Sequence, residues 1–350
     1  GISFYTFQTL SYTIDVYRRE LEPTKSFMDF LFFVSFFPQL VAGPIVRASD
    51  FIPQIYEKLR LTKEDFNRAL FLIIGGLIKK AVISDYISSN FVDRVFDAPN
   101  SYTAFENLMA SYGYAIQIYC DFSGYSDIAI GLALLMGFWL PDNFRTPYQS
   151  ASVTEFWRRW HISLSTWLRD YLYISLGGNR NGKFRTYINL FLTMLLGGLW
   201  HGASWKFVFW GTLHGLALAF ERFFGNFIKL PKNHFIKTLQ ILLTFHFVAF
   251  CWLFFRAKDF VTAIEVIQNI GKVTFDVNQW MVIISGYKNV FLLMTIGFIW
   301  HFLPEKMVNL MQNTFKALPL IGKAIVLGFV FWIVYATASA GPQPFIYFQF

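Results

Sequence analysis

Long stretches without a charged side chain are the feature that most constrains what this chain can fold into. Only 15% of its 350 residues are charged and 55% are hydrophobic, whereas about a quarter of a typical soluble domain is charged. The charges are also clustered, so that long apolar runs remain between them. This pattern is typical of helical proteins that cross a lipid bilayer several times. We therefore predict an all-α, polytopic membrane protein.

Apolar segments follow one another along the whole chain. They lie at 27–46, 66–83, 104–119, 123–140, 187–200, 203–224, 238–255, 288–303 and 323–340. Several reach the ~20 residues that cross a bilayer, whereas others are short or interrupted, as by Pro38, Gly43 and Pro44. Interrupted segments predict kinked or re-entrant helices, which are tolerated where protein or a cavity surrounds them. With no repeat and no linker, we predict one membrane domain over residues 1–350.

The basic residues, which give a net charge of +8, gather in short connecting loops. The loop 179–185 carries three cations and no acid, which predicts a cytoplasmic location. The loop 47–68 mixes in acids and predicts an interfacial helix, and a third basic loop spans 229–237. Loop-borne charge of this kind argues against nucleic-acid binding. Cys120 and Cys251 lie in apolar surroundings and predict buried thiols without a disulfide.

Two carboxylates, Asp121 and Asp127, stand at the head of an apolar run in "DFSGYSDIAIGLALL". Carboxylates inside membrane segments are rare and often line functional sites, which makes both aspartates candidate substrate-binding residues. Helix capping is the alternative, because Asp121 or Ser123 could cap a helix that begins after Gly124. The sequence leaves both interpretations open.

A second polar group lies in "EFWRRWHISLSTWLRD", residues 155–170. Its tryptophans and arginines are typical of a helix anchored at the membrane interface, and Glu155 and Arg159 are spaced as helical ion-pair partners. Arg158 and Arg159 are also candidates for attracting an anionic substrate. Interfacial anchoring does not account for His161, which we treat as a candidate functional residue.

A third group, "GGLWHGASW" at residues 197–205, places His201 among glycines and tryptophans. Glycine permits close approach of a ligand or a backbone, and Trp200 and Trp205 would supply apolar walls, with Trp200 a candidate substrate contact. A desolvated imidazole stays neutral, the form that a general base needs. The plain alternative is a histidine that only packs. Motifs for a protein nucleophile, a metal, a phosphate loop or a dinucleotide are absent, so we expect no metal and no bound cofactor.

The histidines are also compatible with two other kinds of function, haem binding and membrane transport. His201 and His214 are 13 residues apart, a spacing of ~20 Å on one helix that could hold two haems. Haem ligation needs a matching histidine pair on a second helix, and His234, His246 and His301 do not provide one. A membrane transporter without chemistry is the other alternative. His214 itself, within "GTLHG", predicts a close helix contact.

Four segments together resemble the membrane-bound O-acyltransferase (MBOAT) family, in particular its bacterial alginate O-acetyltransferase branch. They are "QLVAGPIVRASDFIPQI", "DFSGYSDIAIGLALLMGFWLPDNFRTPYQS", "FWRRWHISLSTWLRDYLYISLGGNR" and "GGLWHGASW". The similarity extends to the terminal "PFIYFQF", which looks like a natural C-terminus. The initial Gly1, in contrast, predicts that further membrane helices precede this chain in a longer protein.

The resemblance implies a multi-helix fold with a central funnel or tunnel. It implies that His201, in the W-H-G motif, is the catalytic base and that His161 orients the acceptor or stabilises the developing oxyanion. The expected reaction is acetyl transfer from a cytoplasmic thioester, acetyl-CoA or an acyl carrier, towards hydroxyls of an exported polysaccharide. The acceptor would be the polymer or an extracytoplasmic acetyltransferase partner, and the location the bacterial inner membrane. D-alanyl transfer to teichoic acid is the alternative within the family.

Overall fold

The computed structural model describes residues 2–40, 42–225, 231 and 233–338, and every regular element within them is helical. This confirms the predicted all-α class. The terminal segment 344–350 and much of the predicted basic loop 229–237 lie outside the described residues.

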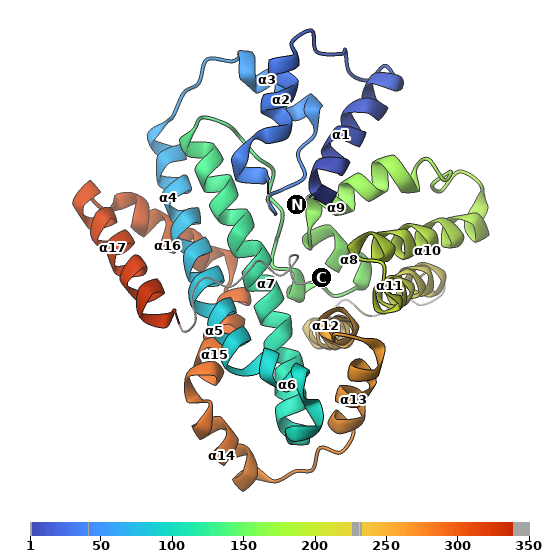
Figure 1. Ribbon diagram of the computed structural model, residues 1–350, viewed down its shortest axis with the longest axis vertical. Helices are drawn as coiled ribbons and strands as arrows, with labels where there is room; N and C mark the ends of the chain where they lie inside the picture. Colours follow the sequence, from blue (N-terminus) through green and yellow to red (C-terminus); the bar gives the residue numbers. More distant parts are fainter. Residues whose placement is uncertain (1, 41, 226–230, 232, 339–350) are drawn as a thin grey trace.

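The helices are connected mostly by short turns (Figure 1). The α-helices are α1 (Ile2–Tyr17), α2 (Phe27–Ser35), α3 (Ala48–Tyr56), α4 (Lys63–Leu77), α5 (Asp85–Ile87), α6 (Asp93–Asp97), α7 (Ala104–Leu135), α8 (Val153–Arg159), α9 (Ile162–Trp167), α10 (Gly182–His201), α11 (Trp205–Phe224), α12 (His234–Arg256), α13 (Phe260–Ile270), α14 (Val277–Gly286), α15 (Lys288–His301), α16 (Glu305–Ala317) and α17 (Leu320–Thr337). The 3₁₀ turns are η1 (Phe37–Gln39), η4 (Pro99–Ser101) and η5 (Pro147–Gln149). Three π-helical turns are η2 (Ile78–Ser84), η3 (Ser88–Val92) and η6 (Leu168–Tyr173).

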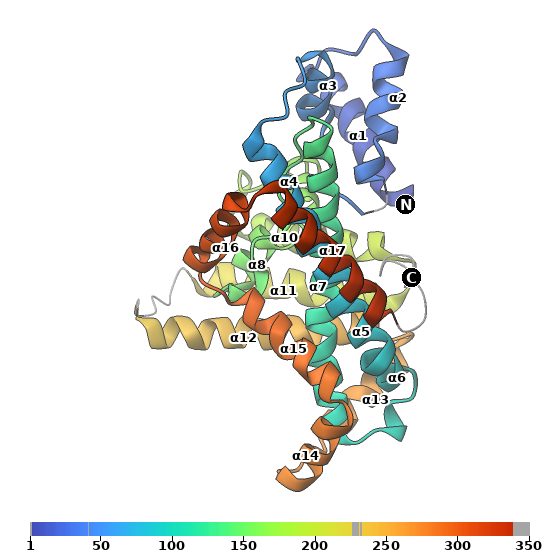
Figure 2. The same cartoon turned by 90° about the vertical axis from the view of Figure 1, so that its left-hand side faces the viewer.

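Helix α7 runs through the middle of the molecule in both ribbon views (Figure 1, Figure 2). A capping box starts it, since the Thr103 hydroxyl accepts from the Glu106 backbone N–H while the Glu106 carboxylate accepts from that of Thr103. Gly137, with φ +82°, lies just beyond its end and lets the chain turn away. Because most of its residues are buried, α7 serves as the axis around which the other helices pack.

The continuity of α7 corrects one expectation from the sequence. We predicted two segments, with a new helix after Gly124, but α7 passes through this point unbroken. Asp121 and Ser123 therefore lie in the helix interior and cap nothing. Gly124 marks a close helix crossing instead, because a Cβ atom there would lie 2.8 Å from the Gly76 carbonyl oxygen of α4. Small residues allow such close approach between apolar helices.

Helices α10 and α11 form a tight pair across a seam of glycines. A Cβ atom on Gly211 would lie 2.4 Å from the Met194 carbonyl oxygen, and one on Gly198 would lie 2.4 Å from the Phe207 carbonyl oxygen. A Cβ atom on Gly215 would lie 3.0 Å from Cα of Phe191. His214 stands between two of these seam glycines, which agrees with the helix contact predicted for it.

Three described helices are long and apolar enough to cross a membrane: α7, α12 and α17. The pair α14 and α15 passes the same test together but is bent by 93°, as in a broken span or a re-entrant loop. Helix α17 lies on the outside of the molecule (Figure 2) and exposes an apolar surface that includes Phe329 and Trp332. Such a surface is suited to contact with lipid.

Candidate active site

His201 is the last residue of α10, where the helix ends against the turn that leads into α11. The ring centroids of Trp210 and Phe255 each lie 5.1 Å from the imidazole centroid, and that of Trp200 lies 4.9 Å away. Helices α10, α11 and α12 thus all contribute walls to one aromatic cage. Trp205, which we expected to be a wall, is 82% exposed, because the turn places it on the outer side of α11.

Gly202 follows His201 and allows the cage to close. A Cβ atom at this position would lie 2.7 Å from Cε2 of Phe207, a ring that itself packs against Phe255 at 5.2 Å. The glycine predicted to favour close approach is therefore used for approach of a protein ring. Trp200, predicted as a substrate contact, stacks on Phe7 of α1 at 4.9 Å.

His161 lies between α8 and α9 and is only 1% exposed. Its Nδ1 atom is 3.1 Å from Oδ1 of Asn143. The same Oδ1 accepts hydrogen bonds from the Ser163 backbone N–H at 3.2 Å and from the Ser163 hydroxyl at 2.9 Å. The edge of the Phe122 ring of α7 packs on the imidazole with centroids 4.6 Å apart. His161 is thus held by polar contacts on one side and by aromatic packing on another.

The backbone around His161 is strained and supported. His161 has φ +43°, a left-handed conformation that costs a non-glycine residue about 1–3 kcal/mol and is found mainly at functional sites. The Ile162 N–H donates to the Asn143 carbonyl at 2.9 Å, and the Arg145 N–H donates to the Arg159 carbonyl at 2.9 Å. These two bonds pair the loop 143–145 with the turn that carries the histidine.

The structure brings His161 and His201 into one centre. Burial lowers the pKa of His161, which lies outside the apolar helices long enough to span a bilayer, and the nearby imidazole of His201 lowers it further. Aromatic rings connect the two: Trp160 lies 5.0 Å from Trp252, which lies 5.3 Å from the Phe255 of the His201 cage. Two histidines 40 residues apart in sequence therefore share an apolar surrounding that favours their neutral forms.

Three of the other predicted site residues, Arg159, Asp121 and Asp127, form ion pairs within the protein. Arg159 pairs with Glu155 at 2.7 Å, as its helical spacing predicted, and also donates to the Arg145 carbonyl at 3.3 Å. Arg158 is exposed on α8. Asp121 pairs with Lys80 at 2.5 Å, and Asp127 pairs with Lys79.

We did not predict a role for Lys79 and Lys80 from the sequence. Two adjacent lysines inside the apolar segment 66–83 nevertheless indicate cations that need partners within the protein. Both belong to the π-helical turn η2, where the wider helix turn changes the direction of successive side chains. Lys80 also pairs with Asp85 at 2.7 Å. The two aspartates of α7 therefore form ion pairs with cations from a neighbouring element.

Two further histidines have structural partners. Nδ1 of His214 accepts a hydrogen bond from Nε1 of Trp157 at 3.2 Å. Nε2 of His301 accepts from the Tyr148 backbone N–H at 2.9 Å, and the Tyr148 hydroxyl donates to the Ala115 carbonyl at 2.6 Å. Both histidines join elements that are distant in sequence.

A cavity of about 300 Å³ opens beside the His161 network. It is lined by Ile45, Arg47, Ser49, Asp50, Pro141, Asp142, Ile162, Ser163, Thr166, Arg169 and Asp170. The Ser163 hydroxyl, which donates to Asn143, also accepts from the Ile45 N–H at 2.9 Å. The cavity wall and the histidine support therefore share one side chain. A larger cavity of about 950 Å³, at Thr154, Glu221 and Lys237, includes no candidate site residue in its described lining.

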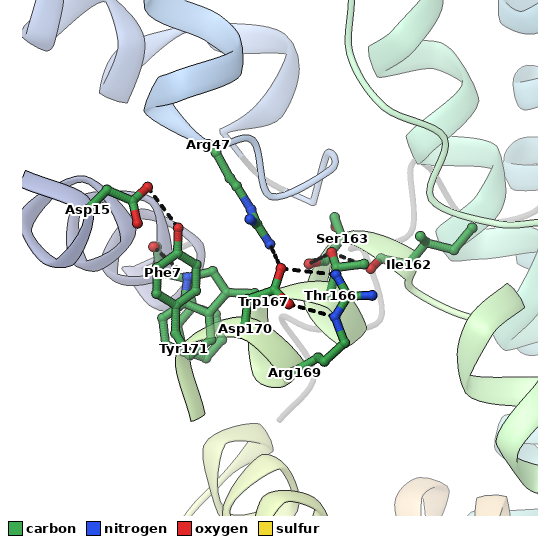
Figure 3. Close-up of polar contacts among 10 residues, drawn as sticks. All are labelled: Phe7, Asp15, Arg47, Ile162, Ser163, Thr166, Trp167, Arg169, Asp170 and Tyr171. Atoms are coloured by element: carbon green, nitrogen blue, oxygen red, sulfur yellow. Dashed lines mark hydrogen bonds and ion pairs between the residues drawn. The ribbon is translucent and has the colours of Figure 1, made fainter. Parts of the chain in front are cut away.

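Two arginines converge on Asp170 at this cavity (Figure 3). Arg47 pairs with Asp170 from the start of α3, and Arg169 pairs with it at 2.6 Å from η6. Burial would raise the pKa of Asp170, but the hydrogen bonds from Arg169 and Arg47 outweigh it and hold the pKa below its usual range. Asp170 therefore remains ionised and fixes both guanidinium groups at the cavity.

Comparison with known proteins decides the family. Residues 7–261 match the family described as MBOAT, membrane-bound O-acyltransferase. The chain belongs to this family. The match covers every element of the site, from Phe7 beside Trp200 to Phe255 beside His201, and it confirms the resemblance read from the four sequence segments.

Individual relatives differ in the acceptors that their names state. The chain is 46% identical over 280 residues to "Probable alginate O-acetylase AlgI" of Pseudomonas aeruginosa, covering 80% of this chain and 52% of that protein. It is 41% identical over 298 residues to the peptidoglycan O-acetyltransferase of Helicobacter pylori, covering 77% and 56%. The teichoic acid D-alanyltransferase of Bacillus subtilis is 31% identical over 275 residues, covering 74% and 69%. The chain thus spans about half the length of the alginate relative.

Proposed function

We propose that this protein is a histidine-dependent O-acetyltransferase of the bacterial inner membrane. It transfers acetyl groups from a cytoplasmic thioester towards hydroxyl groups of an exported polysaccharide, of which alginate is the first candidate. The observation that carries the proposal is the proximity of two histidines, the buried His161 and the partly buried His201, in one aromatic centre of a membrane-bound O-acyltransferase. Greater identity to the alginate relative than to the D-alanyltransferase favours acetyl over D-alanyl transfer.

In the proposed reaction, His201 is the general base. Its neutral imidazole takes the proton of the acceptor hydroxyl while the oxygen attacks the thioester carbonyl. The tetrahedral intermediate then collapses, the carbon–sulfur bond breaks, and the imidazolium returns the proton to the departing thiolate. The products are an O-acetyl ester and a free thiol, and the histidine is restored. The aromatic cage of Trp210 and Phe255 assists by excluding water, which would otherwise hydrolyse the thioester.

We place the donor at the cavity beside Arg47 and Arg169. Phosphopantetheine, which coenzyme A and acyl carrier proteins share, carries amides, a hydroxyl and a phosphate. The cavity offers the hydroxyls of Ser49, Ser163 and Thr166 and two guanidinium groups, Arg47 and Arg169, beside three aspartates. Guanidinium groups are suited to binding a phosphate, and the basic loops 47–68 and 179–185 favour the cytoplasmic side.

The test is acetyl transfer by membranes that carry the full-length protein. Labelled acetyl-CoA and a labelled acetyl carrier protein are supplied as separate donors, with polysaccharide or a co-expressed acetyltransferase partner as acceptor. His201→Ala is expected to lower the rate by about 100-fold or more, because general-base assistance contributes ~10²–10⁴-fold. His246→Ala, which removes an exposed histidine from α12, is the matched control and should retain wild-type activity.

Three outcomes would contradict the proposal. If His201→Ala transfers acetyl groups at the wild-type rate, His201 is not the general base. If label is transferred only from a D-alanyl thioester, the donor carries D-alanine and not acetyl. A wild-type protein that carries the polymer across the membrane without acetylating it would be a transporter. Matched protein levels, checked by immunoblot, exclude poor expression as the cause of any loss.

A further inference from the structure

The amide of Asn143 has a fixed orientation because one of its neighbours can only donate. The Ser163 backbone N–H points at the terminal atom of the Asn143 side chain from 3.2 Å, so that atom is the carbonyl oxygen Oδ1 and not the amide nitrogen. The opposite atom, Nδ2, donates to the Ser126 hydroxyl of α7 at 3.2 Å. Asn143 is only 1% exposed, so the protein rather than solvent holds it in this position.

The fixed amide in turn determines which nitrogen of His161 carries the proton. Oδ1 of Asn143 is an acceptor only, and it lies 3.1 Å from Nδ1 of His161. The Ser163 hydroxyl donates to the same Oδ1 at 2.9 Å and accepts from the Ile45 N–H, whereas its oxygen lies farther from Nδ1, at 3.5 Å. The neutral imidazole therefore holds its proton on Nδ1, and Nε2, across the ring from Asn143, carries the lone pair.

Two features show that this arrangement is built into the fold. The left-handed backbone of His161 is supported by the hydrogen bond from the Ile162 N–H to the carbonyl of Asn143 itself. Asn143 therefore supports the histidine twice, once through its backbone and once through its side chain. Phe122 covers one part of the imidazole at 4.6 Å and Phe144 another at 6.5 Å, which limits rotation of the ring.

We infer that Asn143 is a positioning residue that holds His161 in the tautomer whose Nε2 accepts a hydrogen bond from a hydroxyl of the acceptor. The inference rests on the proposed function, and it chooses between two roles that the sequence left open. A neutral imidazole with a lone pair on Nε2 cannot donate a hydrogen bond from that atom to a developing oxyanion. His161 therefore orients the acceptor, whose reacting hydroxyl gives its proton to His201.

The pH dependence of this arrangement involves few groups. Phe122 of α7 and Phe144 of the loop before η5 face the imidazole and do not titrate, and Asn143 and Ser163 are neutral. His201 of α10 is the titratable group whose charge acts on His161. Protonation of His161 removes the Nε2 lone pair, so activity should fall on the acidic side as this histidine titrates.

The test compares Asn143→Asp and Asn143→Leu in the full-length protein, with donor and acceptor varied separately. A carboxylate at Asn143 accepts the same hydrogen bonds and stabilises the imidazolium, so the acidic limb of the pH–rate profile should move to higher pH. Leucine removes the acceptor, and kcat should fall about 10- to 100-fold, as for other residues that orient a functional histidine. The KM for the thioester donor should stay unchanged in both variants.

Two controls separate positioning from folding. Asn67→Leu removes a buried asparagine whose side-chain amide donates to the Lys63 carbonyl of the same helix, α4, and should leave kcat unchanged. Asn143→Leu is also combined with His161→Ala. If Asn143 acts through the histidine, the double variant is no slower than His161→Ala alone. Losses that multiply would overturn the inference, because Asn143 would then act on the fold.

A readout that does not need activity distinguishes this inference from the proposed function. Hydrogen–deuterium exchange at Cε1 of histidine, followed by mass spectrometry, reports the pKa of His161 in the purified protein. Asn143→Asp should raise this pKa relative to wild type, even if the assay shows no acetyl transfer. An unchanged pKa would overturn the contact between residues 143 and 161, whereas a raised pKa without any transfer would count against the proposed reaction alone.

Discussion

At the scale of single residues, the position of each candidate histidine in its element affects what the imidazole can contact. Both candidate histidines stand where a helix begins or ends: His201 closes α10 and His161 precedes α9. Helix ends expose backbone groups and allow the chain to change direction. An imidazole placed there can face a shared centre while the helix body stays apolar. Histidines inside helix bodies, such as His214, have become packing residues.

Gly202 provides the residue-scale prediction. In Gly202→Ala, the new Cβ would meet the Phe207 ring at 2.7 Å and press it into the cage of His201. Misplacement of a reacting group by about 1 Å costs ~10²-fold in rate, so we expect kcat to fall about 10- to 100-fold while the protein still folds. Gly328→Ala is the control, because a Cβ there meets nothing within 4 Å. Equal rates for the two variants would mean that the cage does not position His201.

At the scale of elements, the glycine seam between α10 and α11 fixes where His201, the proposed base, stands. The seam lets the two backbones touch along about two turns, just before the end of α10 that carries His201. Glycine is unfavourable in helices, by about 1 kcal/mol relative to alanine. Its repeated use here indicates that close packing outweighs the loss of helix propensity.

Gly211→Leu tests the seam. The Cβ atom alone would lie 2.4 Å from the Met194 carbonyl oxygen and 3.1 Å from Cα of Gly198, and neither backbone atom can move independently. Overpacking of this kind costs about 1–3 kcal/mol. We expect a lower melting temperature in detergent together with loss of activity. Gly286→Leu, at a position where a Cβ meets nothing within 4 Å, should change neither the melting temperature nor the activity. A Gly211→Leu variant as stable as wild type would show that the close packing of α10 and α11 does not require glycine at this position.

The sequence predicted most helices and the two candidate histidines, but not the continuity of α7 or the role of Asn143. Apolar patterning identified the helices because burial of apolar side chains imposes it, and the isolated histidines stood out because they are costly in apolar surroundings. The single helix α7 was read as two because Gly124 gives the same signal at a helix crossing as at a helix break. Asn143 gave no signal, since its role depends on a contact across 18 residues that only the folded loop creates.

At the scale of the whole molecule, partly buried ion pairs join the central helix to its neighbours. Lys79 with Asp127 and Lys80 with Asp121 connect η2 to α7 within the molecule. Buried pairs contribute little net stability relative to apolar residues, but breaking one leaves an uncompensated charge. Their value lies in fixing the register between α4, η2 and α7, on which the Phe122 wall beside His161 depends.

Removing one charge should therefore cost more than removing both. Asp127→Asn leaves the Lys79 ammonium without its counterion, and we expect a loss of about 3–5 kcal/mol, seen as a lower melting temperature in detergent. The double variant Lys79→Met with Asp127→Leu should be more stable than that single variant. Glu64→Gln, which breaks an exposed pair with Lys316, is the control and should cost under ~1 kcal/mol. A single variant as stable as wild type would place Asp127 among substrate contacts instead.

These paired charges also bear on how relatives of this protein can diverge. A lineage that loses one member of the Lys79–Asp127 pair passes through a destabilised intermediate, whereas surface charges such as Glu64 drift independently. Lys80 has two carboxylate partners, so one of them can be lost first while the other keeps the ammonium neutralised. We therefore expect substitutions of Asp85 to be tolerated first among relatives. Lys79 and Asp127 should be either both kept or both replaced.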